Sequence, residues 1–321
     1  MADPMQPRNS TTVRSGMSAP LPVRLAFAAL GTVAPSLAAR AGARLFLTPH
    51  VARGRRESPA GAEPFRVRAG REVLRAWRYG EGPAVLLVHG WAGRAEQLAP
   101  FIEPLRAAGC APVLFDAPAH GASTGSVTSG LGFAEAVSAV ATAVGARAAI
   151  AHSLGGFGLA WALASGLALD AAVLVAPPRG PVEFFRRFCD ALGLPPGVRD
   201  ATRDRLARRL GIAVDDVDLV RRVGSTPLLV IHDRHDREVP WSEGEAIARA
   251  WPGASLVSTS GLGHRRILRD GAVTARASAF VVDRLTRCGC GCGRLATGAD
   301  LCAQCGLARD LFHVSSRWPR A

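Results

Sequence analysis

The sequence predicts an α/β fold in which a mostly parallel central sheet carries helices on both faces. Short runs of β-branched and other apolar residues alternate with longer segments rich in alanine and leucine, which is the pattern of parallel strands joined by helices. The expected strands of this sheet span residues 85–88, 112–115, 148–151, 171–175, 228–231 and 255–257. Before them, residues 65–67 and 72–77 are expected to pair as antiparallel strands. With 48% hydrophobic residues in a chain of 321, there is enough apolar material for a large core.

The charge of the chain is strongly positive. Lys and Arg number 39 against 26 Asp and Glu, the formal net charge is +13, and every one of these basic residues is arginine. The arginines are scattered in pairs rather than gathered in one tract, so we attribute the charge to a preference for arginine over lysine and do not expect nucleic acid as a partner. No apolar run reaches the ~18 residues that a membrane-spanning helix needs, which excludes an integral membrane protein.

Residues 1–64 are expected to precede the main domain as a disordered leader, an amphipathic helix over residues 21–46 and a linker. The helix is predicted from one apolar stripe formed by Leu30, Val33, Leu37, Ala41 and Leu45. A signal peptide is the alternative for residues 21–46, but Arg24 and Pro35 interrupt its apolar region, and we favour the helix. Peripheral contact of this helix with a membrane is left open.

The alternation of strands and helices breaks between residues 177 and 226. This segment contains three expected short helices, at residues 182–192, 199–210 and 216–223. Chain inserted after the carboxyl end of a strand lies over the ligand crevice of an open α/β sheet, so the segment is predicted to be a lid. The main domain is therefore expected to span residues 65–286, with residues 287–321 as a separate tail.

One expected strand ends in His-Ser and turns directly into a helix. Such a turn holds Ser153 in a strained conformation at the helix N-terminus, and the small residues Ala151 and Gly155 allow the strand and the helix to approach closely. The run Ala-His-Ser-Leu-Gly-Gly over residues 151–156 resembles the nucleophile elbow of α/β-hydrolase-fold serine hydrolases, with Ala151 in place of the usual first glycine. The resemblance implies that Ser153 is the nucleophile.

Two loops upstream of this serine also resemble that family. Residues 85–93 are similar to its oxyanion-hole strand and loop, which implies that the backbone N–H groups of Trp91 and Leu154 bind an oxyanion and that His89 has a structural role. Residues 115–123 are similar to a structural segment of the family, which implies that Asp116 and His120 fix the loop close to the site.

Two loops downstream of the serine resemble the segments that supply the acid and the base. Residues 228–240 resemble the acid loop, and the spacing from Val239-Pro240 assigns the acid to Asp236, with Asp233 as an alternative. Residues 261–266 resemble the Gly-His loop, which implies that His264 is the base. The chain order Ser, Asp, His is the order of this fold.

The resemblance covers residues 65–285 and implies an enzyme of the carboxylic ester hydrolase class (EC 3.1.1-like). It would cleave a small-molecule ester or related acyl compound through an acyl-enzyme on Ser153, with no catalytic cofactor. The apolar side chains of Phe184, Phe185, Phe188 and Leu192 in the lid would favour an acyl chain or another apolar group. The alternative is a non-catalytic binding protein, in which the arginines and the tail contact nucleic acid, acidic lipid or a protein.

Five of the seven cysteines lie in the C-terminal tail, at positions 288, 290, 292, 302 and 305. Their spacing resembles a zinc ribbon, and the expected ligands of a structural zinc are Cys290, Cys292, Cys302 and Cys305. Cys288 is the alternative to Cys290, and His313 is an outside candidate. Disulfides are the other interpretation, but three cysteines at a spacing of two suit a metal better than pairwise bridges. Thiolates that bind a metal indicate a reducing compartment, so we expect a cytoplasmic location.

Overall fold

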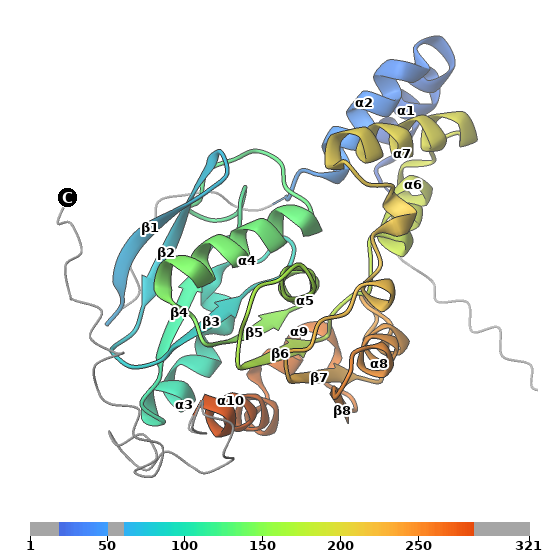
Figure 1. Cartoon of the computed structure of the whole chain (residues 1–321). Coiled ribbons are helices and arrows are strands. Elements are labelled where there is room, and N and C mark those ends of the chain that lie inside the picture. Colours follow the sequence, from blue (N-terminus) through green and yellow to red (C-terminus); the bar gives the residue numbers. More distant parts are fainter. Residues whose placement is uncertain (1–18, 51–60, 286–321) are drawn as a thin grey trace, which may run out of the picture. The chain divides into compact units, whose positions relative to one another are not determined.

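The computed structural model describes residues 19–50 and 61–285, which divide into two compact units. Among the described residues, one unit, here called the helical unit, comprises residues 19–46 and 182–214. The other, here called the sheet unit, comprises residues 47–50, 61–181 and 215–285. Each unit is described by itself below, and Figure 1 gives the element labels used for both.

The sheet unit is built on one eight-stranded sheet with the order β1-β2-β4-β3-β5-β6-β7-β8 (Figure 1). The pairs β1/β2 and β2/β4 are antiparallel, and all the other neighbours are parallel. The mostly parallel sheet that the sequence predicts is therefore confirmed. The strands are β1 Glu63–Ala69, β2 Glu72–Arg78, β3 Ala84–Val88, β4 Ala111–Phe115, β5 Ala148–His152, β6 Ala171–Val175, β7 Leu228–Asp233 and β8 Ser255–Thr259.

Helices cover both faces of this sheet, so every residue of the central strands β3 to β7 is buried. On one face, side chains such as Leu87 and Ile150 pack with α3 (Ile102–Ala107) and α10 (Gly271–Leu285). The other face carries α4 (Gly130–Val144), α5 (Leu154–Ala164) and α8 (Trp241–Ala250). Burial on both faces explains why these strands appear in the sequence as continuous apolar runs rather than as alternating patterns.

Of the three short helices expected in residues 177–226, two are present and the third is not. The helices α6 (Val182–Leu192) and α7 (Pro196–Leu210) form, but only 3₁₀ turns occur at Val214–Asp216 and Leu219–Arg221. Asp218 lies between these turns in an extended conformation, and its carboxylate accepts a hydrogen bond from the N–H of Val220 at 3.0 Å. This local capping bond starts a new turn at Leu219 and prevents a continuous helix.

The helical unit contains α1 (Leu21–Val33), α2 (Pro35–Phe46), α6 and α7, and the single helix expected over residues 21–46 is wrong. The chain breaks at Ala34, which has φ −145° and ψ 69°, because a residue that precedes proline is disfavoured in the α conformation.

The predicted apolar stripe on this segment is also wrong. Val33 is 86% exposed and Leu37 is 55% exposed, whereas α2 buries four small residues, Ala38, Ala39, Gly42 and Ala43. Small side chains allow α2 to lie close to α7, and a Cβ at Gly42 would be 3.2 Å from the Oγ1 of Thr202. Close helix packing, rather than the burial of large apolar side chains, therefore decides which face of α2 is inside.

Phe185 and Phe188 of α6 pack in the core of the helical unit. The ring of Phe46 makes edge contacts with Phe185 and Phe188, at centroid distances of 5.5 Å and 5.2 Å. Phe185 is 2% exposed and Leu192 is 4% exposed. These side chains are already used in packing, so they do not support the preference for an acyl chain that the sequence suggested.

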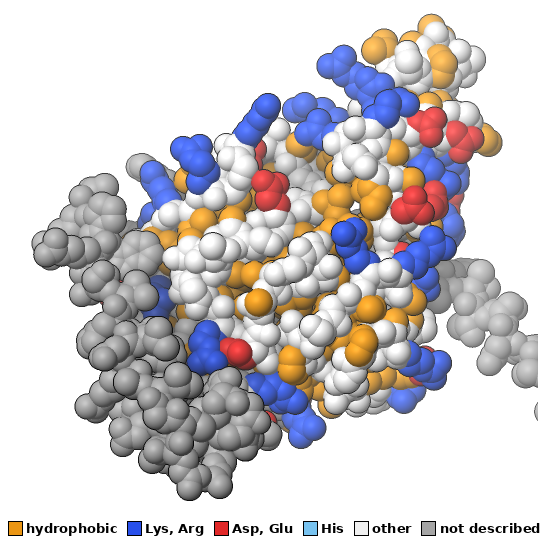
Figure 2. Space-filling model, viewed as in Figure 1, with side chains coloured by type: hydrophobic (Ala, Val, Ile, Leu, Met, Phe, Trp, Pro, Cys, Tyr) orange, Lys and Arg blue, Asp and Glu red, His pale blue; other side chains and the backbone are white. Residues whose placement is uncertain are grey.

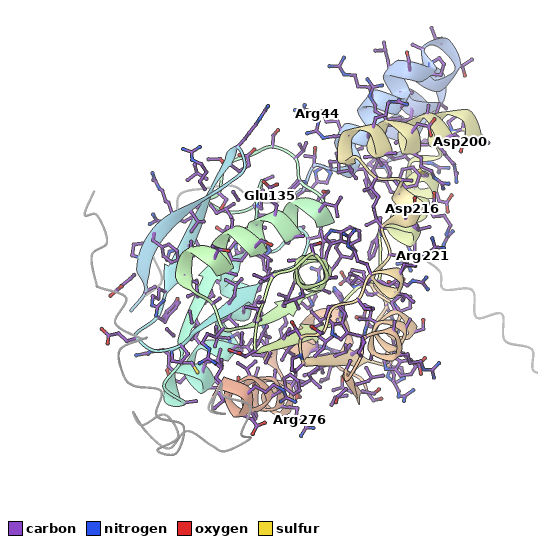
Figure 3. The ribbon with its side chains drawn as sticks, viewed as in Figure 1. Arg44, Glu135, Asp200, Asp216, Arg221 and Arg276 are labelled. Carbon is purple, nitrogen blue, oxygen red and sulfur yellow. The ribbon has the colours of Figure 1, made fainter. Side chains whose placement is uncertain are left out.

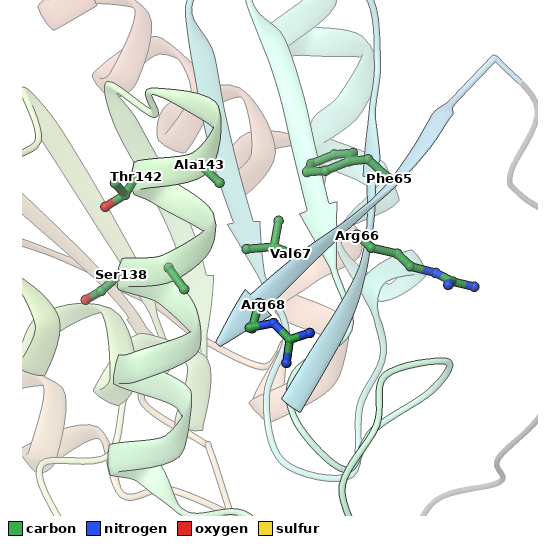
Figure 4. Close-up of a pocket in the computed structure, with 8 residues that line it drawn as sticks. Phe65, Arg66, Val67, Arg68, Ser138, Thr142 and Ala143 are labelled. Atoms are coloured by element: carbon green, nitrogen blue, oxygen red, sulfur yellow. The ribbon is translucent and has the colours of Figure 1, made fainter. Parts of the chain in front are cut away.

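Exposed charged side chains on the helices of the sheet unit include Glu135 on α4 and Arg276 on α10 (Figure 3). The unit carries a shallow groove of about 590 Å³ between β1 and α4, which is lined by Phe65, Arg66, Val67, Arg68, Ser138, Ala139, Thr142 and Ala143 (Figure 4). Among the helices of the described residues, none combines the length and the apolar character that crossing a bilayer requires.

Candidate active site

Ser153 occupies a strained turn between β5 and α5. Its φ of 52° and ψ of −125° place a non-glycine residue in a region that L-amino acids rarely adopt. The turn is held by a 2.9 Å hydrogen bond from the Ser153 N–H to the carbonyl oxygen of Val175 in β6. A Cβ at Gly155 would collide with the carbonyl oxygen of His89, so only glycine lets α5 approach β3 this closely. The local sequence therefore fixes both the strain and the position of the serine.

The structure brings the three residues of the proposed triad together in a hydrogen-bonded chain. The Nε2 of His264 lies 3.0 Å from the Oγ of Ser153, and its Nδ1 lies 2.7 Å from the Oδ2 of Asp236. Ser153 and Asp236 are each 9% exposed, and His264 is 8% exposed. Ser153 follows β5, Asp236 follows β7, and His264 lies in the short helix α9 (Gly263–Arg266) after β8. Parallel strands end at the same edge of the sheet, which is why residues more than a hundred positions apart meet there.

The carboxylate of Asp236 is held in its ionised form. Burial by itself would raise its pKa, but hydrogen bonds from His232, His264 and the N–H of Val239 outweigh burial and place the pKa well below the usual value. Its Oδ1 accepts from the N–H groups of Glu238 and Val239 at 2.8 Å and 2.9 Å. The loop thus leaves Oδ2 to accept from Nδ1 of His264.

Asp233, the alternative acid, does not face His264. Its Oδ1 accepts from the N–H of His235 at 2.9 Å, and its Oδ2 accepts from the Oγ1 of Thr259 and the N–H of Leu262 at 2.8 Å and 3.0 Å. Burial opposes the ionisation of Asp233, but these hydrogen bonds lower its pKa below the usual value. Asp233 therefore ties the end of β7 to the end of β8 and to the segment that precedes His264.

The sequence analysis gave no role to two buried histidines that contact the triad. His152 donates from Nε2 to the carbonyl oxygen of His264 at 2.9 Å, and the two rings lie 4.7 Å apart. Burial, together with repulsion from His264, lowers the pKa of His152 to about 3, so the ring is neutral. The signal that could have identified His152 is its position as the last residue of a buried strand.

His232 contacts the opposite side of the acid. Its Nε2 lies 3.1 Å from the carbonyl oxygen of Val239 and 3.4 Å from the Oδ2 of Asp236. A Cβ at Gly244 in α8 would collide with its Nδ1, so this glycine makes room for the ring. His232 thus packs beside the carboxylate and also holds the loop that supplies its two backbone donors.

The loop that follows β3 is fixed by His89. The Nε2 of His89 accepts from the N–H of Ala117 at 2.9 Å, so its Nδ1 carries the proton and donates to the carbonyl oxygen of Gly90 at 2.7 Å. Burial lowers the pKa of His89 to about 4, which keeps the ring neutral and both of these bonds intact. This geometry agrees with the structural role expected for His89.

His120 and Asp116 hold the same region from the neighbouring loop. The Nε2 of His120 accepts from the N–H of Ala92 at 3.1 Å. The two carboxylate oxygens of Asp116 accept from the N–H groups of Ala95 and Ala122, at 3.0 Å and 2.8 Å. Both residues therefore fix loops beside the site, as the sequence indicates.

The two backbone donors expected in an oxyanion hole belong to Leu154, which follows Ser153, and to Trp91, which follows Gly90. Leu154 is the first residue of α5, so its N–H has no acceptor within that helix. Within the part of the chain that the structure describes, neither the Leu154 N–H nor the Trp91 N–H donates a hydrogen bond. Gly90 packs against the nucleophile, because a Cβ at this position would be only 2.8 Å from the Cβ of Ser153. The oxyanion role of Trp91 and Leu154 stays a prediction that this arrangement supports.

The expected zinc ligands Cys290, Cys292, Cys302 and Cys305 lie outside the described residues, as do Cys288 and His313. Within residues 19–50 and 61–285, no group of three or more His, Cys, Asp or Glu side chains could hold a metal ion. Cys110 and Cys189 in this part are buried free thiols, and burial raises the pKa of Cys189 to about 11. The metal prediction therefore rests on the sequence of the tail.

Comparison with known proteins agrees with this geometry. Residues 85–277, more than half of the chain, match the alpha/beta hydrolase family, and the protein belongs to that family. Among curated protein sequences, none matches this chain.

Solved structures resemble the chain over most of its length. An esterase from Pyrococcus furiosus is 20% identical with a TM-score of 0.57, covering 74% of this chain and 97% of its own. A Butyrivibrio proteoclasticus protein with bound ferulic acid is 20% identical with a TM-score of 0.55, covering 70% of this chain and 100% of its own. Alpha/beta hydrolase domain-containing protein 10 from mouse is 17% identical with a TM-score of 0.54, covering 68% of this chain and 96% of its own. At these identities, the likeness shows a shared fold.

Proposed function

We propose that the protein is a serine hydrolase that cleaves a carboxylic ester or a related acyl compound. The observation that carries the proposal is the continuous chain from the Oγ of Ser153 through His264 to Asp236, with links of 3.0 Å and 2.7 Å. The strained backbone of Ser153 gives further support, because strain of this kind clusters at functional sites. Esterases among the structures of similar fold make an ester the first substrate class to test.

In the proposed reaction, Nε2 of His264 accepts the proton of Ser153 as Oγ forms a bond to the substrate carbonyl carbon. The electron pair of the carbonyl moves onto its oxygen, where the N–H groups of Trp91 and Leu154 would stabilise the negative charge. The tetrahedral intermediate then expels the alcohol oxygen, which takes the proton from His264, and the acyl group stays on Ser153. Water deprotonated by His264 attacks this ester in the same way and releases the acid. No cofactor takes part in these steps.

A serine at the nucleophile position also narrows the chemistry. Haloalkane dehalogenase and epoxide hydrolase chemistry in this fold uses a carboxylate nucleophile, which the chain does not have at position 153. Esters, thioesters, amides and lactones remain as substrate classes. Within the esters, a panel graded by acyl chain length would show which acyl groups the site accepts.

Labelling with a fluorophosphonate probe tests the proposal directly. The probe reacts with an activated serine, so we expect one label per chain on Ser153 and none in Ser153→Ala. Ser165→Ala is the matched control, because Ser165 is an exposed serine at the other end of α5. Well-folded protein that takes no label would contradict the proposal and favour the non-catalytic binding protein.

We further propose that the C-terminal tail holds one structural zinc through Cys290, Cys292, Cys302 and Cys305, and that the protein acts in the cytoplasm. Five cysteines in 18 residues, three of them at a spacing of two, support a metal site, and reduced thiolates need a reducing compartment. Small-molecule acyl substrates are the partners expected of the sheet unit, and nucleic acid is not expected.

A further inference from the structure

Helix α1 exposes large apolar side chains to solvent. No residue of this 13-residue helix is fully buried. Leu21 is 63% exposed and Leu25 is 60% exposed, and their spacing of four places them on one face. Val33 at the end of α1 and Leu37 at the start of α2 add to the exposed apolar surface, at 86% and 55%. We call these four residues the N-terminal apolar surface.

The opposite face of α1 already has its packing partners inside the helical unit. A Cβ at Gly31 would lie 3.1 Å from Val198 and 3.3 Å from Pro195, so this side of the helix lies against the start of α7. Phe27 and Leu30, which share this side by their spacing, are only partly exposed. The part of the N-terminal apolar surface on α1 is therefore additional to the face of this helix that already packs inside the unit.

The helical unit that carries this surface has an excess of positive charge. Helices α1 and α2 contain Arg24, Arg40 and Arg44 and no acidic residue. Among its described residues, the helical unit has ten arginines and four acidic residues, an excess of six positive charges. Figure 2 shows hydrophobic side chains and arginines side by side on the surface of this unit.

Exposed apolar side chains together with an excess of arginines favour an anionic lipid surface as the partner. Two copies of the chain that met through this surface would bring the same arginines together, and like charges oppose that contact. An anionic lipid surface offers the opposite charge to the arginines and an apolar layer to the leucines. A helix with an apolar outer face and flanking basic residues suits the plane of a lipid interface.

We propose that α1 binds the surface of anionic phospholipid bilayers, with Leu21 and Leu25 inserted below the headgroups and the arginines close to the lipid phosphates. The proposal does not depend on the proposed esterase activity. It places the helical unit at the lipid surface and leaves the sheet unit outside the bilayer.

Sedimentation of the full chain with lipid vesicles tests the proposal. We expect binding to vesicles of phosphatidylglycerol and phosphatidylcholine in equal parts, and at least about tenfold weaker binding to phosphatidylcholine alone. Leu25→Asp should weaken binding to the anionic vesicles about tenfold or more. Val223→Asp is the matched control, because Val223 is a 39% exposed valine of the sheet unit, and it should bind as the unchanged protein does.

Each other outcome overturns the proposal. One is the absence of vesicle binding, and a second is equal binding by Leu25→Asp and Val223→Asp. Equal binding to the two kinds of vesicle would remove the role of the arginines. A dimer in sedimentation velocity that Leu25→Asp dissociates, without vesicle binding, would assign the surface to a second copy of the chain. Because Leu25 is exposed, Leu25→Asp should keep the melting temperature of the unchanged protein, which checks that the variant folds.

Discussion

The Nε2 of His152 donates a hydrogen bond of 2.9 Å to the backbone carbonyl oxygen of His264. The residue that precedes the proposed nucleophile thereby holds the main chain of the proposed base, although 112 positions separate the two. With its pKa lowered to about 3, His152 stays neutral and adds no positive charge beside His264. The hydrogen bond couples the end of β5 to α9 and positions the imidazole that must reach Oγ of Ser153.

Removing this donor should slow the reaction without preventing folding. In His152→Leu, the carbonyl of His264 loses its partner, and we expect the rate constant of fluorophosphonate labelling to fall about tenfold, which corresponds to about 1.4 kcal/mol. His152→Gln keeps a donor of similar reach and should restore part of the rate. If both variants fell equally while their melting temperatures stayed unchanged, His152 would not act through this bond.

Substitution of Asp236 and of Asp233 should affect the labelling rate very differently. Asp236→Asn removes the acceptor of the Nδ1 proton of His264, and we expect the labelling rate to fall by about 10⁴. Asp233→Asn leaves that contact in place and weakens the bonds to Thr259 and Leu262, so its main effect should be a lower melting temperature with a much smaller loss of rate. A larger rate loss in Asp233→Asn than in Asp236→Asn would reverse the assignment. The comparison is matched because both variants exchange a buried aspartate for asparagine, one at the end of β7 and one three residues further on.

The sheet could be predicted because its strands are continuous apolar runs, and the triad because each member sits in a local pattern at a strand end. The contacts of His152 and His232 could not be predicted in this way. His152 donates a hydrogen bond to a carbonyl oxygen 112 positions away, and the residues around His152 in the sequence do not indicate such a distant partner. His232 fits its site only because α8 offers Gly244 there, which depends on how the helix packs.

The N-terminal helices were mispredicted for a different reason. Pro35 was visible in the sequence, but the apolar spacing across it suggested one continuous helix. The structure follows the proline instead and breaks at Ala34. Alanines of α2 are buried, because α2 and α7 lie so close together that only small side chains fit between them. Large apolar residues such as Leu37 stay outside, and the spacing of apolar residues could not reveal this.

Gly90 should not tolerate a side chain. A Cβ at this position would be 2.8 Å from the Cβ of Ser153 and 3.3 Å from the Nδ1 of His152, so Gly90→Ala must displace the nucleophile or the loop. We expect the labelling rate to fall at least 100-fold, roughly the loss that a small misplacement of catalytic groups causes. Gly271→Ala is the control, since a Cβ there meets nothing within 4 Å and should leave the rate unchanged. A Gly90→Ala protein that labelled at the full rate would show that the loop can move away from Ser153.

The metal content of the purified full chain tests the zinc proposal. We expect about one zinc per chain, and loss of that zinc in the double variant Cys302→Ser/Cys305→Ser, because four thiolates are needed to close the site. Labelling at Ser153 should survive in that variant, since the tail is expected to be separate from the sheet unit. Protein without zinc whose tail cysteines are oxidised would contradict both the metal site and the cytoplasmic location.

Two buried histidines should make the sheet unit sensitive to mildly acidic pH. Burial lowers the pKa of His89 to about 4 and of His152 to about 3, whereas the same side chains in the unfolded chain titrate near 6.5. Below about pH 6.5 the unfolded chain therefore binds more protons than the folded one. As the pH is lowered, the free energy of unfolding should fall by up to about 1.4 kcal/mol per pH unit for each histidine. Carboxylates with lowered pKa values, such as Asp236, change the free energy of unfolding only at lower pH. The change in stability between about pH 4.5 and 6.5 is therefore assigned to the histidines.

Urea unfolding at several pH values between 5 and 7, followed by tryptophan fluorescence, measures this slope in the sheet unit, because the helical unit has no tryptophan among its described residues. His89→Gln can keep an acceptor for the N–H of Ala117 and a donor for Gly90 but cannot be protonated, so it should reduce the slope. His50→Gln replaces an exposed histidine and should leave the slope as it is. Stability that stayed constant from pH 7 to pH 5 in the unchanged protein would show that neither buried histidine is held neutral by the fold.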